Sequence, residues 1–222
     1  MKSLKFLASI GAAAAVLGVS AQGANVVQNG TFDDTSAWMG SFTPQPGTSS
    51  FPDIDTGSYY WGGRASFNQI SQRYDFSASD TLALNTSGLA FTMSADLFGY
   101  STQGDWSSFE AVFVDAGDNT LGNALLSSVD GDPGTWPDPL VAGTGPNFQS
   151  TTGTIPLTTV AIKFFVSSTR VAGISNDGYL DNALFDLRAA SGSMDPVPVP
   201  AALPLMAFGV AGLGVMRRRR RS

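Results

Sequence analysis

Alternating apolar and polar residues dominate the middle of the chain. From Leu89 to Leu97 every second residue is apolar, which predicts a half-buried strand. Glu110 to Asp115 and Val160 to Val166 also predict strands, the second with Lys163 on its polar side. Weaker strand signals cover Val26 to Gln28, Ser58 to Ser66, Ile70 to Phe76 and Ile155 to Leu157. Clusters of Gly, Pro, Asn, Asp and Ser separate these segments, so the pattern predicts an all-β fold, an antiparallel β-sandwich or jelly roll of about seven to nine short strands.

One long segment, from Ser127 to Gln149, has no convincing strand signal. Loops of this length are usually functional or mobile. Two interpretations stay open here, a ligand-facing loop and a merely flexible insertion.

The two ends of the chain have a different pattern, in which long apolar runs adjoin basic residues. Residues 1–21 combine Lys2 and Lys5, an apolar stretch from Phe6 to Val19, and small residues up to Ala21. This order predicts a signal peptide, a helix removed by signal peptidase after Ala21 or, as second choice, after Ala24. An amphipathic cytosolic helix is the alternative, but the segment has no polar face.

The C-terminal end divides into a Pro-rich linker at 191–200, an apolar segment at 201–216 and a basic tail at 217–222. A helix over the apolar segment rises about 24 Å, a little less than the roughly 30 Å of a bilayer core. We therefore expect a single short transmembrane helix. Because Lys and Arg beside a span stay on the cytoplasmic side, residues 22–190 are expected to face outward as one β-sandwich domain.

The linker and tail resemble the PEP-CTERM sorting signal, in its Val-Pro-x-Pro-Ala variant. The matching residues are Val197, Pro198, Val199, Pro200 and Ala201, then small residues in the apolar run, then Arg217, Arg218, Arg219, Arg220 and Arg221. The resemblance implies that an exosortase removes the tail and passes the protein to the cell surface or the extracellular matrix. The alternative is a plain tail anchor that is never cut. In both cases the protein is exported and held at a membrane.

The charge of the exported body differs from that of the whole chain. Of twelve basic residues, seven lie in residues 1–21 and 217–222, whereas all eighteen acidic residues lie between these two segments, from Asp33 to Asp195. The exported body, counted with its linker, therefore carries a net charge of −13, which disfavours nucleic acid and anionic membrane surfaces as partners. Neutral polysaccharides and cations remain compatible with it. Glu110 is the only Glu among these acids, and an excess of Asp is typical of turns.

The absence of Cys and His restricts the chemistry that the chain can perform. It removes Ser-His-Asp and Cys-His nucleophile systems, the usual zinc sites and histidine ligation of haem. A glycosidase needs only two carboxylates, so a glycoside-acting enzyme is the one catalytic alternative that composition leaves open. We expect no catalysis and no required cofactor.

Three short segments of the body resemble galactose-binding-like β-sandwiches, many of which are carbohydrate-binding modules. They are Asn25 to Asp33 with Trp38 after it, Ile70 to Gln72, and Gly178 to Phe185. In that family a structural calcium ion often lies between the first and last strands. The resemblance implies that side-chain oxygens of Asp33 and Asp181 lie near such an ion.

The position of Asp181 supports this comparison. On a regular strand it shares its parity with four residues, Tyr179, Ala183, Phe185 and Leu187. A carboxylate on an apolar face needs a partner or a metal ion, and calcium takes six to eight oxygen ligands. The alternative is that Asp181 faces solvent at a strand end or pairs with Arg73 or Arg188.

Aromatic residues in polar loops are the candidates for sugar binding, because sugar rings stack on exposed Trp and Tyr. Trp106 and Trp136 fit best, and Tyr59, Tyr60 and Trp61 come next. The alternative is that these rings cap the core. The sequence thus favours an exported surface or matrix protein with a non-catalytic, polysaccharide-binding sandwich. The competing hypothesis is a structural matrix or surface-coat protein without a small ligand.

Overall fold

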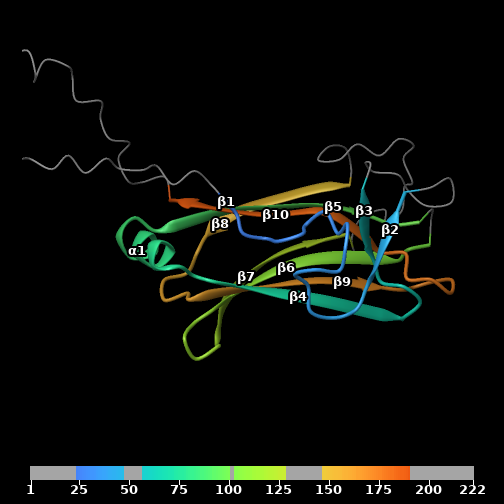
Figure 1. Ribbon diagram of the computed structural model, residues 1–222, viewed down its shortest axis with the longest axis horizontal. Helices are drawn as coiled ribbons and strands as arrows, with labels where there is room; N and C mark the ends of the chain where they lie inside the picture. The colour runs from blue at the N-terminus through green and yellow to red at the C-terminus, as the bar shows by residue number, and fades with distance from the viewer. Residues whose placement is uncertain (1–23, 48–56, 101–102, 129–146, 191–222) are drawn as a thin grey trace, which may run out of the picture. The chain divides into compact units, whose positions relative to one another are not determined.

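Two antiparallel sheets form the body of the protein, and a computed structural model describes its residues 24–47, 57–100, 103–128 and 147–190 (Figure 1). Sheet A has six strands, in the order β2 (Thr43–Pro46), β3 (Ser58–Trp61), β10 (Tyr179–Ala189), β5 (Leu89–Phe98) and β8 (Phe148–Thr154), with β1 (Ala24–Asn25) also pairing with β10. Sheet B has four, in the order β4 (Phe67–Asp75), β9 (Ala161–Thr169), β6 (Trp106–Val114) and β7 (Thr120–Ser127). The predicted all-β sandwich is confirmed.

The core lies between the sheets and is built by the alternation seen in the sequence. In β5 the residues Leu89, Phe91, Met93, Ala95 and Leu97 all point inward and are buried. Phe91 stacks on Phe185 of β10 with ring centroids 4.8 Å apart, and Phe185 meets Phe164 of β9 edge to face at 5.2 Å. Rings from both sheets therefore interlock.

Four predicted strands correspond to observed ones. Leu89 to Leu97 is β5 almost to the residue, Ile70 to Phe76 falls within and just beyond β4, and Val160 to Val166 coincides with most of β9. Glu110 to Asp115 is the second half of β6, which begins earlier, at Trp106.

Other strand predictions were wrong or had the wrong bounds. Ile155 to Leu157 is not a strand, because β8 ends at Thr154 and the chain then turns through Thr158, whose φ is +71°. The strand from Ser58 stops at Trp61, and β1 ends at Asn25, before the predicted Val26 to Gln28. Strands β2, β7 and β8 were not predicted.

A short helix, α1 (Ala78–Thr86), was also missed. Ser77 caps it: its hydroxyl accepts the backbone N–H of Asp80, whose carboxylate accepts the backbone N–H of Ser77 at 2.9 Å. Only Leu84 of the helix is fully buried, so the sequence carries little helical periodicity. Burial, and next the hydrogen bond to Asp80, raise the pKa of Tyr74 to about 12.

The segment from Val26 to Phe42 seals one side of the sandwich. It inserts Phe32, Trp38 and Phe42 into the core. Met39 exchanges two backbone hydrogen bonds, of 2.7 and 2.9 Å, with Ser71 on the outer edge of β4. The buried amide of Gln72 accepts from the backbone N–H of Gln28 at 2.9 Å and donates to its carbonyl at 3.0 Å. Sheet B is thereby joined to the segment that connects β1 and β2 of sheet A.

A second glutamine joins the sheets on the opposite side, where β7 and β8 are the outermost strands. The half-buried amide of Gln149 accepts from the backbone N–H of Ser127 at 3.2 Å and donates to its carbonyl at 2.9 Å. Within the described residues, these two hydrogen bonds of Gln149 are the only ones that join β8 to β7.

Both terminal segments predicted from the sequence, the signal peptide and the sorting tail with its transmembrane helix, lie outside the described residues. Among the residues that the structure does describe, no helix has the length and apolar character to cross a membrane.

Candidate functional site

The outer face of sheet B, which we call the sheet B face, carries aromatic rings among hydrogen-bonding groups. Residues directly opposite each other in antiparallel strands point to the same side of the sheet. The inward parity of β6 and β9 holds Phe109, Phe164 and Val166, so the other parity forms the face. Its central members are Phe67, Gln69, Ser71, Arg73, Lys163, Phe165, Ser167, Thr169, Trp106, Ser108 and Glu110.

Three rings lie on the sheet B face. Trp106 is half-buried and lies opposite Thr169, which in turn lies opposite Phe67 on β4. Phe67 is 53% exposed although it is a large apolar side chain. Phe165, four residues before Thr169 on β9, is half-buried as well, so the rings span about 13 Å along the strands. Such spacing suits an extended ligand.

Polar side chains fill the rows between the rings. The hydroxyls of Ser108 and Ser167 lie 2.7 Å apart on neighbouring strands. In the next row, Glu110 lies opposite Phe165 and accepts a 2.8 Å hydrogen bond from the side-chain amide of Asn123. The only Glu of the chain is thus held by an amide and has no second carboxylate opposite it on β9 or β7. This row offers hydrogen bonds to hydroxyl groups.

A charged cluster closes one end of the face. Arg73 and Lys163 lie opposite each other, and both donate to Asp118, with Arg73 also 2.7 Å from Asp75. Hydrogen bonds, from Lys163 first and then Arg73, lower the pKa of Asp118, so the carboxylate stays ionised beside them. Next to the cluster is a hollow of about 230 Å³, lined by Met39, Ser71, Gln72, Arg73, Lys163 and Phe165.

Trp106 is positioned by the buried carboxylate that precedes it. Asp105 is 1% exposed and accepts three backbone N–H groups, from Val171 at 2.6 Å, Ala172 at 3.0 Å and Asp177 at 2.8 Å. It therefore binds the β9–β10 loop to the start of β6. Burial, and less so the charge of Asp105, raise the pKa of Asp177. A Cβ added at Gly178 would lie 2.2 Å from the carbonyl oxygen of Trp106, so the two backbones touch there.

The other predicted sugar-binding aromatics fare differently. Trp136 lies outside the described residues. Tyr60 is fully buried in the main core, and Tyr59 is buried in a second cluster with Phe98 and Tyr179. The prediction that Tyr59 and Tyr60 are exposed stacking rings is therefore wrong. Trp61 is half-buried and packs against that second cluster.

The two predicted calcium ligands have different environments. Asp33 is exposed, and its carboxylate accepts the backbone N–H of Ser58 at 3.0 Å and the hydroxyl of Thr31 at 2.8 Å. Asp181 is fully buried and lies directly opposite Asp96, which is also fully buried. Within the described residues, no group of three or more His, Cys, Asp or Glu side chains is placed to hold a metal ion.

The expected parity of Asp181 was wrong. A bulge between Asp181 and Leu184 shifts the register of β10, so Leu180, Ala183 and Phe185 face the core. Asp181 instead shares the outer face of sheet A with Tyr179 and, across the strands, Asp96. The alternative also fails, because Asp181 is buried from solvent while Arg73 pairs with Asp75 and Asp118, and Arg188 donates to Thr92.

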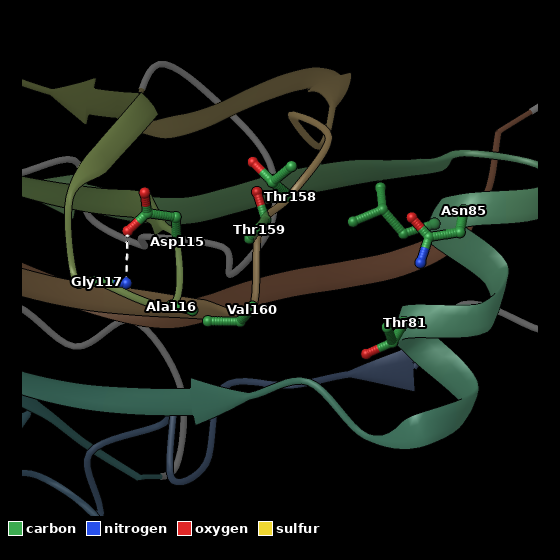
Figure 2. A pocket seen from close by; sticks show the side chains of 9 residues that line it. Thr81, Asn85, Asp115, Ala116, Gly117, Thr158, Thr159 and Val160 are labelled. Atoms are coloured by element: carbon green, nitrogen blue, oxygen red, sulfur yellow. Dashed lines mark hydrogen bonds between the residues drawn. The ribbon is translucent and has the colours of Figure 1, made fainter.

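A larger hollow, of about 570 Å³, lies where α1 meets the turns that follow β6 and β8 (Figure 2). Thr81 and Asn85 of α1 face Thr158 and Thr159 across it (Figure 2). Its one ionisable side chain, Asp115, accepts the backbone N–H groups of Gly117 at 2.8 Å and Asn119 at 2.9 Å. These bonds, those from Asn119 first, lower its pKa. Asp115 thus closes a turn, and the described residues that line the hollow include no pair of carboxylates for acid-base catalysis.

Sequence reasoning found Trp106 but missed the rest of the sheet B face. Phe165 was detectable, because it shares its parity with Lys163 on the polar side of the predicted strand. An aromatic ring on a polar face is a signal for binding. Phe67 was hidden, since the predicted strand began only at Ile70.

No protein-family model matches the sequence, and the comparison with curated proteins found no match. Among solved structures, TmCBM61 in complex with β-1,4-galactotriose is 14% identical with a TM-score of 0.44; the match covers 75% of this chain and 99% of that one. The CBM22-1 xylan-binding domain from Paenibacillus barcinonensis Xyn10C is 10% identical with a TM-score of 0.41, over 76% of this chain and 97% of that one. The enzymatically active domain of bacteriophage CBA120 tailspike protein 4 is 13% identical with a TM-score of 0.45, over 73% of this chain but only 21% of that one. These likenesses concern the course of the backbone and identify no residue of this chain.

Proposed function

We propose that this chain is an exported, non-catalytic polysaccharide-binding protein and that the sheet B face is its binding surface. The observation that carries the proposal is the placement of Trp106, Phe67 and Phe165 on the outer face of sheet B, among Ser, Gln and Glu side chains. Rings of this kind stack on the C–H faces of sugars, and the polar groups between them bind hydroxyls.

The charges of the face favour a neutral polysaccharide. Arg73 and Lys163 already pair with Asp75 and Asp118, so little positive charge is left for a uronate or sulfate group. The net charge of −13 on the exported body would in addition repel a polyanion. A neutral glycan meets neither obstacle.

The strand order supports a jelly roll of the galactose-binding-like kind. The chain crosses between sheets A and B after β3, β4, β5, β7, β8 and β9, and two pairs of consecutive strands are neighbours, β2 with β3 at one edge and β6 with β7. Eight strands connected in this manner make two four-stranded layers, β3-β10-β5-β8 and β4-β9-β6-β7.

A structural calcium ion belongs to this proposal, with Asp181 and Asp96 rather than Asp33 as its side-chain ligands. Like charges directly opposite each other in a sheet are unfavourable, and buried ones are costly, so a cation between these two carboxylates would stabilise the fold. Bound calcium would supply that charge. At a hundredfold excess over its dissociation constant it would add about 2.7 kcal/mol of stability.

The calcium hypothesis is tested by melting the full chain in calcium and in EGTA. We expect a higher melting temperature in calcium for the native chain and no difference for Asp181→Asn. Asp33→Asn serves as the control, because its carboxylate binds Ser58 and Thr31 instead. Equal melting of the native chain in both buffers would refute the site.

Export and sorting complete the proposal: signal peptidase would remove residues 1–21, and an exosortase would act at the Val197 to Ala201 motif. Deleting Arg217 to Arg221 should leave an uncleaved precursor in the membrane. Deleting the exosortase should do the same, and normal processing in both strains would contradict this route.

Polysaccharide binding is tested with the full chain and a panel of xylan, β-1,4-galactan, cellulose, alginate and polygalacturonate. We expect binding to at least one neutral polymer, and a loss of about tenfold in affinity for Trp106→Ala and for Phe165→Ala. Leu82→Ala, which removes an exposed apolar side chain from α1, should bind normally. Unchanged binding in both aromatic variants would exclude the sheet B face.

A structural coat protein is the second candidate. The observation that favours it is the uncharged outer edge formed by β7 and β8, which has no Lys, Arg, Asp, Glu or Pro. In that case no polymer of the panel would bind, while the protein would still be found in the matrix.

A further inference from the structure

Among the described strands, β8 is the last strand of sheet A and pairs on one side only, with β5. The backbone bonds at its ends, Leu97 N–H to Asn147 O at 2.9 Å and Ile155 N–H to Leu89 O at 2.8 Å, identify the odd-numbered residues as those bonded to β5. In an antiparallel ladder the alternate residues direct their N–H and C=O groups the other way. The groups of Phe148, Ser150, Thr152 and Thr154 therefore point outward, and none receives a hydrogen bond from the described part of the chain.

Within the residues that the structure describes, this edge lacks the features that usually prevent strands from pairing between molecules. Natural edges are blocked by Pro, by charged residues, by bulges or by a covering segment. Phe148–Thr154 has no Pro, no charge and no bulge, and its side chains alternate between exposed and half-buried. In a body with a net charge of −13, an uncharged strand is the place where two copies repel each other least.

The sequence of β8 also complements itself. If two copies pair antiparallel about Thr151, the outward residues meet one another, which the hydrogen-bond pattern requires. Phe148 then lies opposite Thr154 of the second copy, and Ser150 lies opposite Thr152. On the other face of the strand, Gln149 lies opposite Gly153, which leaves room for its side chain.

From this geometry we propose that β8 is a self-association edge, on which a second copy of this chain adds its own β8 in antiparallel register centred on Thr151. The two copies of sheet A then form one continuous sheet. This inference goes beyond polysaccharide binding and does not depend on it.

The test exploits the predicted opposition of Ser150 and Thr152. In Ser150→Lys/Thr152→Lys, each new lysine lies opposite a lysine of the second copy, whereas in Ser150→Lys/Thr152→Glu each lysine lies opposite a glutamate. Both side chains are exposed, so the monomer should fold normally in each variant, as circular dichroism and melting can verify. The double-lysine variant also lowers the net negative charge, so any weakening cannot come from general repulsion.

Sedimentation of the full chain in mild detergent measures the monomer-dimer equilibrium. We expect a dimer for the native chain, about tenfold weaker association for the double-lysine variant, and recovery to within about threefold for the Lys/Glu variant. Because the chain has no cysteine, Thr151→Cys should form a disulfide dimer under oxidation, and Gln69→Cys on β4 should not. A native monomer, a dimer insensitive to the two lysines, or failure of the Lys/Glu variant to recover would each overturn the proposal.

Discussion

The edge strands on the two sides of the sandwich differ in how far they are protected from pairing with another strand. On one side, β2 carries Pro44 and Pro46, and β4 is covered by a segment that pairs with it at Met39. On the other side, β7 and β8 are uncharged strands joined only through Gln149 within the described residues. The first side, which we call the closed side, is thus blocked by proline at β2 and by the chain's own N-terminal segment at β4. The second side, which we call the open side, carries neither feature within the described residues. The difference supports the proposal that two copies of the chain pair at the open side.

The largest effect should come from proline in β8, placed either at a residue that bonds to β5 or at a residue that points outward. Thr151→Pro removes an N–H that bonds to β5 and should destabilise the fold by about 3 kcal/mol or more. Thr152→Pro removes an outward N–H that bonds to no group in the described part of the monomer, and should cost about 1 kcal/mol or less. Urea denaturation of both variants measures the two costs. Equal destabilisation would mean that β8 is not an open edge.

The next effect compares the two glutamines that join the sheets. Gln72→Leu removes a buried amide that bonds to both the N–H and the C=O of Gln28, and should cost about 2 to 3 kcal/mol. Gln149→Leu breaks the same two bonds to Ser127 at a half-buried position and should cost about 1 kcal/mol. Thermal unfolding of the two variants gives the ratio. A larger loss of stability from Gln149→Leu than from Gln72→Leu would reverse the assignment of the closed and open sides.

The central strands of the sandwich were predicted better than the edge strand β8, for a physical reason. A strand with one face in the core alternates strongly, as Leu89 to Leu97 does, and period two then reveals it. Strand β8 reads Phe-Gln-Ser-Thr-Thr-Gly-Thr and buries little on either face, so it carries no alternation to detect. Edge strands are the least visible elements in a sequence when polar side chains cover both faces.

The candidate site was predicted in part. Trp106 was singled out as a loop residue, because Gly104 and Asp105 before it suggested a turn. Asp105 accepts backbone hydrogen bonds from the β9–β10 loop. Trp106 itself is the first residue of strand β6. The face of Asp181 was not predictable from parity, since one bulge in β10 exchanges the two faces of the strand. Bulges of this kind depend on the partner strand.

Opening the closed side is the third test. Pro44→Thr/Pro46→Thr would restore two N–H groups to β2, with a change in monomer stability of about 1 kcal/mol or less. If the prolines prevent pairing, this variant should form assemblies larger than the native dimer, because each copy then has a second usable edge. Light scattering against concentration measures their size, and Thr43→Ser on the same strand is the control. No growth beyond the native state would show that β2 is protected in some other way.

The smallest expected effect concerns the charged cluster, in which Asp118 on the turn between β6 and β7 pairs with Arg73 of β4 and Lys163 of β9. Strands β7 and β8 themselves contain no ionisable residue. Lys163 and Arg73 lower the pKa of Asp118 in the folded protein, so this interaction stabilises the fold above the ordinary carboxyl pKa of 3.8. The stabilisation is lost as the pH falls below that value through the lowered pKa. Because all three side chains are partly exposed, we expect a small fall in melting temperature between pH 5 and pH 3, reduced in Asp118→Asn and in 1 M salt. An equal fall in the native chain and in Asp118→Asn would assign the pH dependence to other carboxylates, and the charged cluster would then hold the sheet B face in shape without adding to its stability.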